Sequence, residues 1–137
     1  MKNKDCIFCK IVDREIPSKI IFENDFTMAF LDNAPISDGH TIIIPKNHYS
    51  NLEDISEDEL NAVYRVTKKL AIRIHKNLKV DGYNILQNNF GAAGQLIKHF
   101  HVHIIPRRND DKKFQIAIPK IQSSEEKLEE IFKILRA

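Results

Sequence analysis

The sequence predicts an α+β fold in a single domain, residues 1–137. Five short stretches are rich in β-branched, aromatic or other apolar residues, and most of them are separated by turns rather than by helices. Two longer stretches carry apolar residues at helical spacing behind a serine. We therefore expect a mostly antiparallel, five-stranded sheet with one long helix and a C-terminal helix packed on it.

The N-terminal part predicts a short helical turn and a hairpin. Apolar residues cluster over residues 7–12, and a turn or helix there would end near Asp13. Residues 20–23 and 27–31 have the composition of strands, and Asn24-Asp25 between them is a turn dipeptide. These two strands should pair with each other.

The middle of the chain predicts a strand and the long helix. Thr41–Ile44 is a compact β-branched strand that Pro45 is expected to stop. Ser56 and Glu59 have the spacing of a capping box, and apolar residues follow at near-helical intervals. This pattern predicts an amphipathic helix from about residue 58 to residue 76.

The C-terminal part of the chain predicts, in order, a strand, a loop, a further strand and a helix. Tyr83–Gln87 has strand composition, and Asn88–Gly94 is a loop with two of the four glycines. Ser123 and Glu126 have the capping spacing that opens a C-terminal helix.

The run His99–Ile105 reads His-Phe-His-Val-His-Ile-Ile and predicts the fifth strand, ended by Pro106. Successive side chains of a strand point to opposite faces, so the three histidines would line one face and Phe100, Val102 and Ile104 the other. Because the pKa of histidine lies near 7, such a row can attack phosphorus, stabilise negative charge and protonate a leaving group. The alternative is a half-exposed strand whose polar face happens to be histidine.

The composition is that of an ordinary globular protein, with 42% hydrophobic and 29% charged residues. A formal charge of +2 is too small to indicate a polyanion, so neither nucleic acid nor a membrane is an expected partner. The polar N-terminus and the lack of a long apolar run favour a cytoplasmic location. Cys6 and Cys9 would then bind a metal or stay free rather than form a disulfide.

The histidine run resembles the signature of the histidine triad (HIT) family. The similarity covers residues 6–107 and includes residues 29–32, 39–41 and 44–48. It implies a nucleotide phosphohydrolase or nucleotidyl transferase that acts at the α-phosphate of purine nucleotide derivatives, either nucleoside phosphoramidates or dinucleoside polyphosphates. It also implies a homodimer whose sheets join across the long helix and a strand.

The resemblance implies a role for each matching residue. His101 would be the nucleophile that forms a covalent nucleotidyl-histidine, His103 would contact phosphate oxygens, and His40 would lie beside the leaving group. Asp32 would accept both ribose hydroxyls, since a carboxylate offers two acceptor oxygens to a diol, although a turn former is the alternative. Two amides near the ribose or phosphate and an apolar clamp around the base, which could instead be core, complete the set: Asn88, Gln95, Phe8, Ile11 and Phe30.

Cys6 and Cys9 have the Cys-x-x-Cys spacing that can place two thiolates on one metal. The resemblance implies two further ligands, His48 and His99, because a subset of bacterial HIT proteins binds structural Zn²⁺ through such a set. A closed site would tether the N-terminus to the sheet and would take His99 out of proton transfer. The alternative is a pair of buried or free thiols with His48 on the surface.

Leu96 departs from the family pattern, because many HIT members carry a serine or threonine there that contacts the phosphate or leaving group. Proton delivery by that hydroxyl is absent here, which puts efficient phosphoramidate cleavage in question. Lys98 and Pro106-Arg107 look more like members that split dinucleoside polyphosphates. The alternative to an enzyme is a nucleotide-binding regulatory or interaction module with little turnover.

Overall fold

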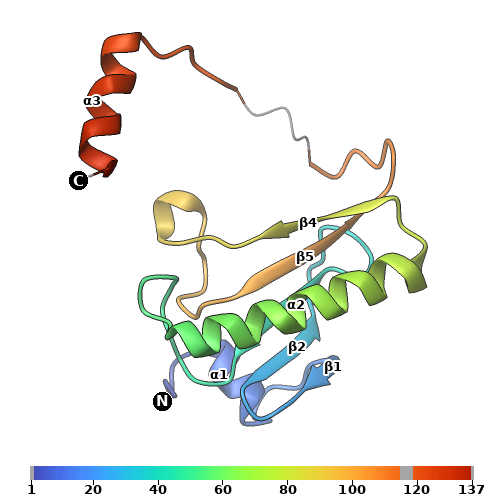
Figure 1. Ribbon diagram of the computed structural model, residues 1–137. Helices are drawn as coiled ribbons and strands as arrows, with labels where there is room; N and C mark the ends of the chain where they lie inside the picture. Colours follow the sequence, from blue (N-terminus) through green and yellow to red (C-terminus); the bar gives the residue numbers. More distant parts are fainter. Residues whose placement is uncertain (1, 115–118, 137) are drawn as a thin grey trace.

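The computed structural model describes residues 2–114 and 119–136 and has the predicted α+β architecture (Figure 1). Five strands form one antiparallel sheet in the order β1-β2-β3-β5-β4. The elements in chain order are α1 (Ile7–Val12), β1 (Ile20–Glu23), β2 (Thr27–Leu31), β3 (Thr41–Pro45), α2 (Glu57–Leu78), β4 (Gly82–Leu86), the 3-10 turn η1 (Gly91–Ala93), β5 (Val102–Arg107) and α3 (Glu125–Arg136).

The β1–β2 hairpin has the predicted strand limits but a longer turn. The Oδ1 atom of Asn24 accepts the backbone N–H groups of Phe26 and Thr27 at 3.0 and 2.8 Å. Asn24 therefore organises the turn through its side chain, as asparagine commonly does, and three residues rather than a dipeptide separate the strands.

The sheet separates two apolar clusters. Along β2 and β3, Ala29 and Ile43 pack beneath α2, whereas Met28 and Ile42 pack on the other side with α1. The alternation predicted for the histidine run holds, because Phe100, Val102 and Ile104 all lie in the cluster beneath α2. The three histidines are consequently left on the face of the sheet that α1 covers.

Strand β5 is shifted along the sequence relative to the prediction. It begins at Val102, so His99 and His101 precede it, and Pro106 lies inside it opposite Tyr83. The carbonyl oxygen of Pro106 accepts a hydrogen bond from the hydroxyl of Ser37 at 2.6 Å. The carbonyl of Pro106, and the side of the backbone where an N–H would lie, therefore point away from β4. The missing proline N–H therefore costs no ladder bond to β4.

Helices α2 and α3 each differ in one detail from the N-terminal caps predicted for them. Ser56 Oγ accepts the N–H of Glu59 at 3.3 Å, but the Glu59 carboxylate accepts bonds from Asn47 and Tyr49 instead of returning to the cap. Helix α3 is capped by Ser124, whose Oγ accepts the N–H of residue 127 at 3.1 Å, one residue later than expected. No helix among the described residues is long and apolar enough to cross a bilayer.

Helix α3 does not pack on the sheet, which contradicts the expectation for it. None of its residues is buried, and Figure 1 shows it beyond β4, away from the sheet and from α2. Helix α2 covers the apolar cluster on its face of the sheet without any residue of α3.

Candidate functional site

A cleft of about 320 Å³ opens beside α1, on the face of the sheet opposite α2. The strands bring its side chains together from distant parts of the sequence. Six of the nine residues expected to bind or process a nucleotide line this cleft: Phe8, Asp32, His40, Asn88, His101 and His103.

His101 presents one nitrogen for chemistry. Its Nδ1 lies 2.6 Å from the carbonyl oxygen of His99, so Nδ1 carries the proton and donates it in a hydrogen bond. Nε2 is then the nitrogen with a free lone pair. Burial lowers the pKa of His101, which keeps the ring neutral near pH 7. The edge of the Phe8 ring contacts the His101 ring, with centroids 5.2 Å apart.

A short hydrogen-bond relay fixes the tautomers of the other two cleft histidines. The N–H of Ile36 donates to His40 Nδ1 at 3.1 Å, so the proton of His40 must reside on Nε2. That Nε2 lies 2.9 Å from Nδ1 of His103 and donates to it. The proton of His103 is therefore on its own Nε2. Burial lowers the pKa of His103 to about 4, so the ring acts as a neutral donor.

Asp32 directly follows β2, where it forms a turn and also lines the cleft. Its Oδ1 accepts the N–H of Ala34 at 2.9 Å, which makes it a turn former. Its Oδ2 lies 3.8 Å from Nε2 of His40, and the side chain lines the cleft. The carboxylate retains acceptor capacity for hydroxyl groups of a ligand.

Three predicted substrate residues lie outside the cleft lining. Gln95 uses both ends of its amide on the loop: Oε1 accepts the N–H of Phe90 at 2.9 Å, and Nε2 donates to the carbonyl of Ser50 at 2.6 Å. It therefore braces the loop. Ile11 and Phe30 are buried in the cluster behind Phe8, which is the core position weighed as their alternative.

Several apolar residues that line the cleft were not among the substrate-binding residues predicted from the sequence. Ile105 follows His103 by two positions, and Ile42 is the cross-strand partner of His103. Continuing the period-two alternation beyond the triad would have found the first, whereas the second needs the strand register. Leu86 from β4 and Leu96, which is 93% exposed, complete the apolar rim.

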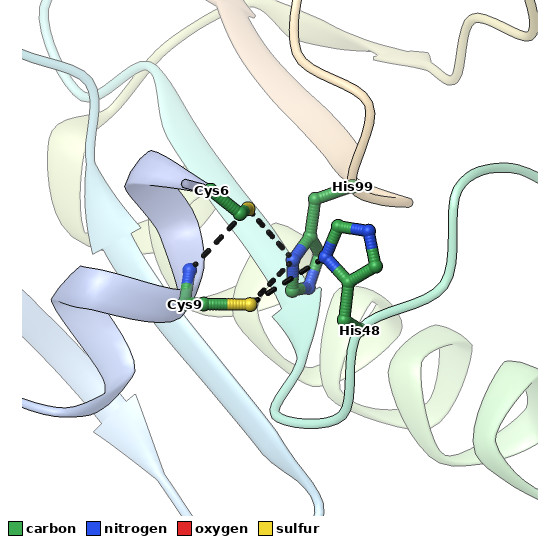
Figure 2. A group of neighbouring side chains, drawn as sticks. All are labelled: Cys6, Cys9, His48 and His99. Carbon is green, nitrogen blue, oxygen red and sulfur yellow. Dashed lines mark hydrogen bonds between the residues drawn. The ribbon is translucent and has the colours of Figure 1, made fainter. Parts of the chain in front are cut away.

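The four residues expected to bind zinc meet beside the cleft (Figure 2). Cys6 is the N-cap of α1 and Cys9 lies within that helix, whereas His48 follows β3 and His99 precedes β5. Nδ1 of His99 lies 3.4 Å from Sγ of Cys6 and 3.6 Å from Sγ of Cys9, and Nδ1 of His48 lies 3.5 Å from Sγ of Cys9. All four potential ligand atoms lie within 4.8 Å of one another.

These distances suit a tetrahedral Zn²⁺ ion. Bonds of the usual Zn–S and Zn–N lengths at the tetrahedral angle would separate sulfur from nitrogen by about 3.6 Å. Nε2 of His99 lies 2.9 Å from the carbonyl oxygen of Pro45, which places the proton there and leaves Nδ1 as the ligand atom. Burial raises the pKa of Cys9 and lowers that of His99 to about 4, so the cluster has no charge of its own to stabilise thiolates. A bound cation would supply that charge.

Comparisons with known proteins give matches that cover most of the chain. The HIT domain model matches residues 13–110. Adenosine 5'-monophosphoramidase HNT1 of Saccharomyces cerevisiae is 40% identical over 132 residues, covering 96% of this chain and 81% of the yeast protein. The crystal structure of SMU.412c from Streptococcus mutans UA159 superposes with a TM-score of 0.92 at 34% identity, over 98% of this chain and 85% of that one. A Zn-bound histidine triad family protein from Mycobacterium smegmatis gives a TM-score of 0.77 at 35% identity, over 85% of this chain and 84% of that one.

Proposed function

Because the chain belongs to the HIT domain family, we propose that it hydrolyses or transfers purine nucleotides at the α-phosphate, with a nucleoside phosphoramidate or a dinucleoside polyphosphate as substrate. The observation that carries this proposal is the pair of ring nitrogens in the cleft. His101 offers an unprotonated Nε2, and its ring centroid lies 4.8 Å from that of His103, which offers an N–H donor. A nucleophile beside a fixed donor is the arrangement that phosphoryl chemistry requires.

The reaction divides into two displacements. Nε2 of His101 forms a bond to the α-phosphorus while the bond from phosphorus to the leaving amine or phosphate breaks, and the leaving group takes up a proton from solvent water. A water molecule then attacks the nucleotidyl-histidine and gives up a proton to solvent, and the P–N bond to His101 breaks to release the nucleoside monophosphate. His103 Nε2–H donates to a phosphate oxygen in both steps, where a preformed donor stabilises the developing charge.

The cleft residues around the histidines position the substrate. Asp32 accepts the ribose hydroxyls with its carboxylate, and Phe8 packs on the base side of the cleft. Asn88 also lines the cleft; among the residues that the structure describes, its Nδ2 makes only a long 3.5 Å contact to the carbonyl of Gly94 and is available to a ligand. His40 acts through His103, because its Nε2–H holds the acceptor nitrogen of that ring.

The Cys/His cluster supports the cleft rather than taking part in the reaction. Zn²⁺ held by Cys6, Cys9, His48 and His99 would supply a fixed cross-link between α1 and the segments that follow β3 and precede β5. All four ligand positions are then filled by protein, which is the mark of a structural site. The cross-link would fix the position of the His99 carbonyl, which accepts the hydrogen bond from Nδ1–H of His101.

Release of AMP distinguishes the enzyme hypothesis from the alternative, a nucleotide-binding module with little turnover. The presence of Leu96, where many family members carry a serine or threonine, favours that alternative. The protein is incubated with adenosine 5'-phosphoramidate and with a diadenosine polyphosphate, and AMP is followed by chromatography while nucleotide binding is measured by calorimetry. We expect release of AMP from one or both compounds at catalytic protein concentration. Binding of AMP without any release at stoichiometric protein concentration would establish the module instead.

Leu96 should limit the cleavage of substrates with poor leaving groups. The amine of a phosphoramidate needs a proton as it departs, and Leu96 puts an alkyl group at the mouth of the cleft where a hydroxyl could deliver one. Leu96→Ser is expected to raise phosphoramidate turnover by about tenfold or more, since a positioned proton donor contributes substantially to rate. A p-nitrophenyl ester of AMP, whose leaving group needs no proton, should show no gain.

The matched control for this experiment is Leu52→Ser. Leu52 is exposed but does not line the cleft, so its replacement should leave both substrates unaffected. An equal change for the two substrates in Leu96→Ser would show that the residue affects binding or folding rather than proton delivery.

A homodimer joined at the edge of the sheet is the assembly we expect. Strand β4 forms one edge, so its outer N–H and carbonyl groups are open to a further strand. Tyr83 and Ile85 on β4 are 38% and 41% exposed, and Tyr64 and Ile72 on α2 are 40% and 56% exposed. An open strand edge combined with exposed apolar side chains favours pairing with a second copy.

A further inference from the structure

Two side-chain amides, which we call the amide pair, hydrogen-bond to each other on either side of Asn88. Nδ2 of Asn89 donates to Oε1 of Gln87 at 2.9 Å, and Nε2 of Gln87 donates to Oδ1 of Asn89 at 2.9 Å. Nε2 of Gln87 also donates to the backbone carbonyl of Asn88 at 3.1 Å. The amide pair therefore holds the backbone before, at and after Asn88.

The amide pair lies outside the cleft that Asn88 lines. Leu86 and Asn88 both line the cleft, whereas Gln87 and Asn89 do not. This is the alternation of an extended chain, in which every second side chain points to the same side. Because Gln87 and Asn89 are held together on one side, the side chain of Asn88 is directed to the other, where the ligand would lie.

A further hydrogen bond anchors the amide pair to a distant segment of the chain. Oδ1 of Asn89 also accepts the backbone N–H of Leu52 at 2.8 Å. The same segment is held a second time, because Nε2 of Gln95 donates to the carbonyl of Ser50 at 2.6 Å. The cleft loop is thus fastened near both of its ends to one neighbouring segment.

The backbone of Phe90 indicates that these contacts impose one conformation on the loop. Its φ is 69°, a value in the left-handed region that residues other than glycine rarely adopt. The side chain is 53% exposed, so packing of the ring does not explain this value. A strained backbone of this kind persists only where its surroundings determine it. Here Asn89 is fixed on one side, and Oε1 of Gln95 accepts the N–H of Phe90 on the other.

We propose that Asn89 is a positioning residue for the nucleotide and that it acts through Asn88. Paired with Gln87 and anchored to Leu52, Asn89 directs the amide of Asn88 into the cleft before a ligand arrives. A donor that is fixed in advance binds more tightly, because less conformational freedom is lost on binding. This inference rests on the proposed function, which places a nucleotide beside Asn88.

The affinity for AMP measures the effect of Asn89, and a double-mutant cycle assigns that effect to Asn88. Asn89→Ala removes the amide pair and its anchor, and it should raise the dissociation constant of AMP by about tenfold. Asn88→Ala should raise the constant by a similar factor. The double variant should bind AMP no more weakly than Asn88→Ala, because Asn89 then has no amide to position. Calorimetry on the full chain measures all three, and effects that multiply in the double variant would overturn the proposal.

The matched control is Asn51→Ala. Oδ1 of Asn51 accepts the N–H of Glu53 at 2.9 Å in the segment that the anchor reaches, and its side chain does not line the cleft. Its replacement removes a turn-forming amide but leaves the amide pair in place, so the affinity for AMP should stay at the wild-type level. An equal loss of affinity in Asn51→Ala would show that any disturbance of these loops weakens binding, which would contradict a specific role for Asn89.

NMR relaxation of the side-chain amide of Asn88 tests the positioning without any ligand. In the nucleotide-free protein this amide should be ordered in the wild type and in Asn51→Ala, and it should gain fast motion in Asn89→Ala. An amide of Asn88 that is equally ordered in all three would overturn the proposal. A wild-type protein that binds AMP but releases none from its substrates would overturn the proposed reaction and not this inference, since neither measurement requires turnover. A wild-type protein that does not bind AMP would overturn both.

Discussion

His101→Asn is expected to reduce AMP release by about four orders of magnitude or more, because loss of a covalent nucleophile removes the first displacement altogether. Asparagine keeps an N–H that can donate to the His99 carbonyl, as Nδ1 of His101 does, but it has no nitrogen able to attack phosphorus. Binding of AMP should change little, since Asp32 and Phe8 remain in place. Steady-state kinetics and calorimetry measure the two effects on the same preparation.

The matched control is His75→Asn. His75 lies on α2, is exposed, and contacts the ring of Tyr83 on the far side of the sheet from the cleft. Its replacement should leave turnover at the wild-type level. Mass spectrometry of wild-type protein quenched during turnover should also show the added mass of a nucleotidyl group on the peptide that contains His101. Turnover by His101→Asn within tenfold of wild type would exclude the covalent route.

The sequence predicts the sheet well because local signals and the fold agree. Strands β1 and β2 have the limits predicted from their composition, and the alternation of the histidine run correctly separates Phe100 from His101. These patterns depend on the alternation of side chains between the two faces of a strand, which can be seen in a few neighbouring residues of the sequence. The resemblance to a known family then supplied the roles of the cleft residues, which composition and spacing alone do not contain.

The errors concern features decided by distant contacts. Pro106 was expected to end β5, but its backbone edge faces Ser37, and nothing near Pro106 in the sequence encodes that neighbour. Gln95 was expected near the ribose or phosphate, and that role stays a prediction; the hydrogen bonds of its amide to Phe90 and Ser50 in the folded loop are a feature that the sequence does not encode. The amphipathic pattern of α3 predicted a face packed on the sheet, but none of its residues is buried, because periodicity alone does not identify a surface that covers the helix.

Cys9→Ser is expected to remove the bound metal and to lower the free energy of unfolding by about 3–5 kcal/mol, because structural zinc sites contribute directly to folding. For a domain of this size the melting temperature should fall by about 10–20 °C. The zinc content of the purified protein, measured by plasma mass spectrometry, should fall from one ion per chain to near zero. Ile7→Ser, on the exposed side of the same helix, is the control and should retain the metal.

The damage from Cys9→Ser should reach the cleft through α1. Phe8 lies between the two cysteines, and its ring contacts both His99 and His101, at centroid distances of 5.8 and 5.2 Å. Release of α1 therefore removes a wall of the cleft, and nucleotide binding should weaken along with stability. The apolar cluster beneath α2 contains no residue of α1, so the rest of the sheet can remain folded and the effect on binding can be measured. A chelator added to the wild-type protein should reproduce the loss of binding, whereas metal content unchanged by the substitution would show that the cluster is a set of free thiols and imidazoles.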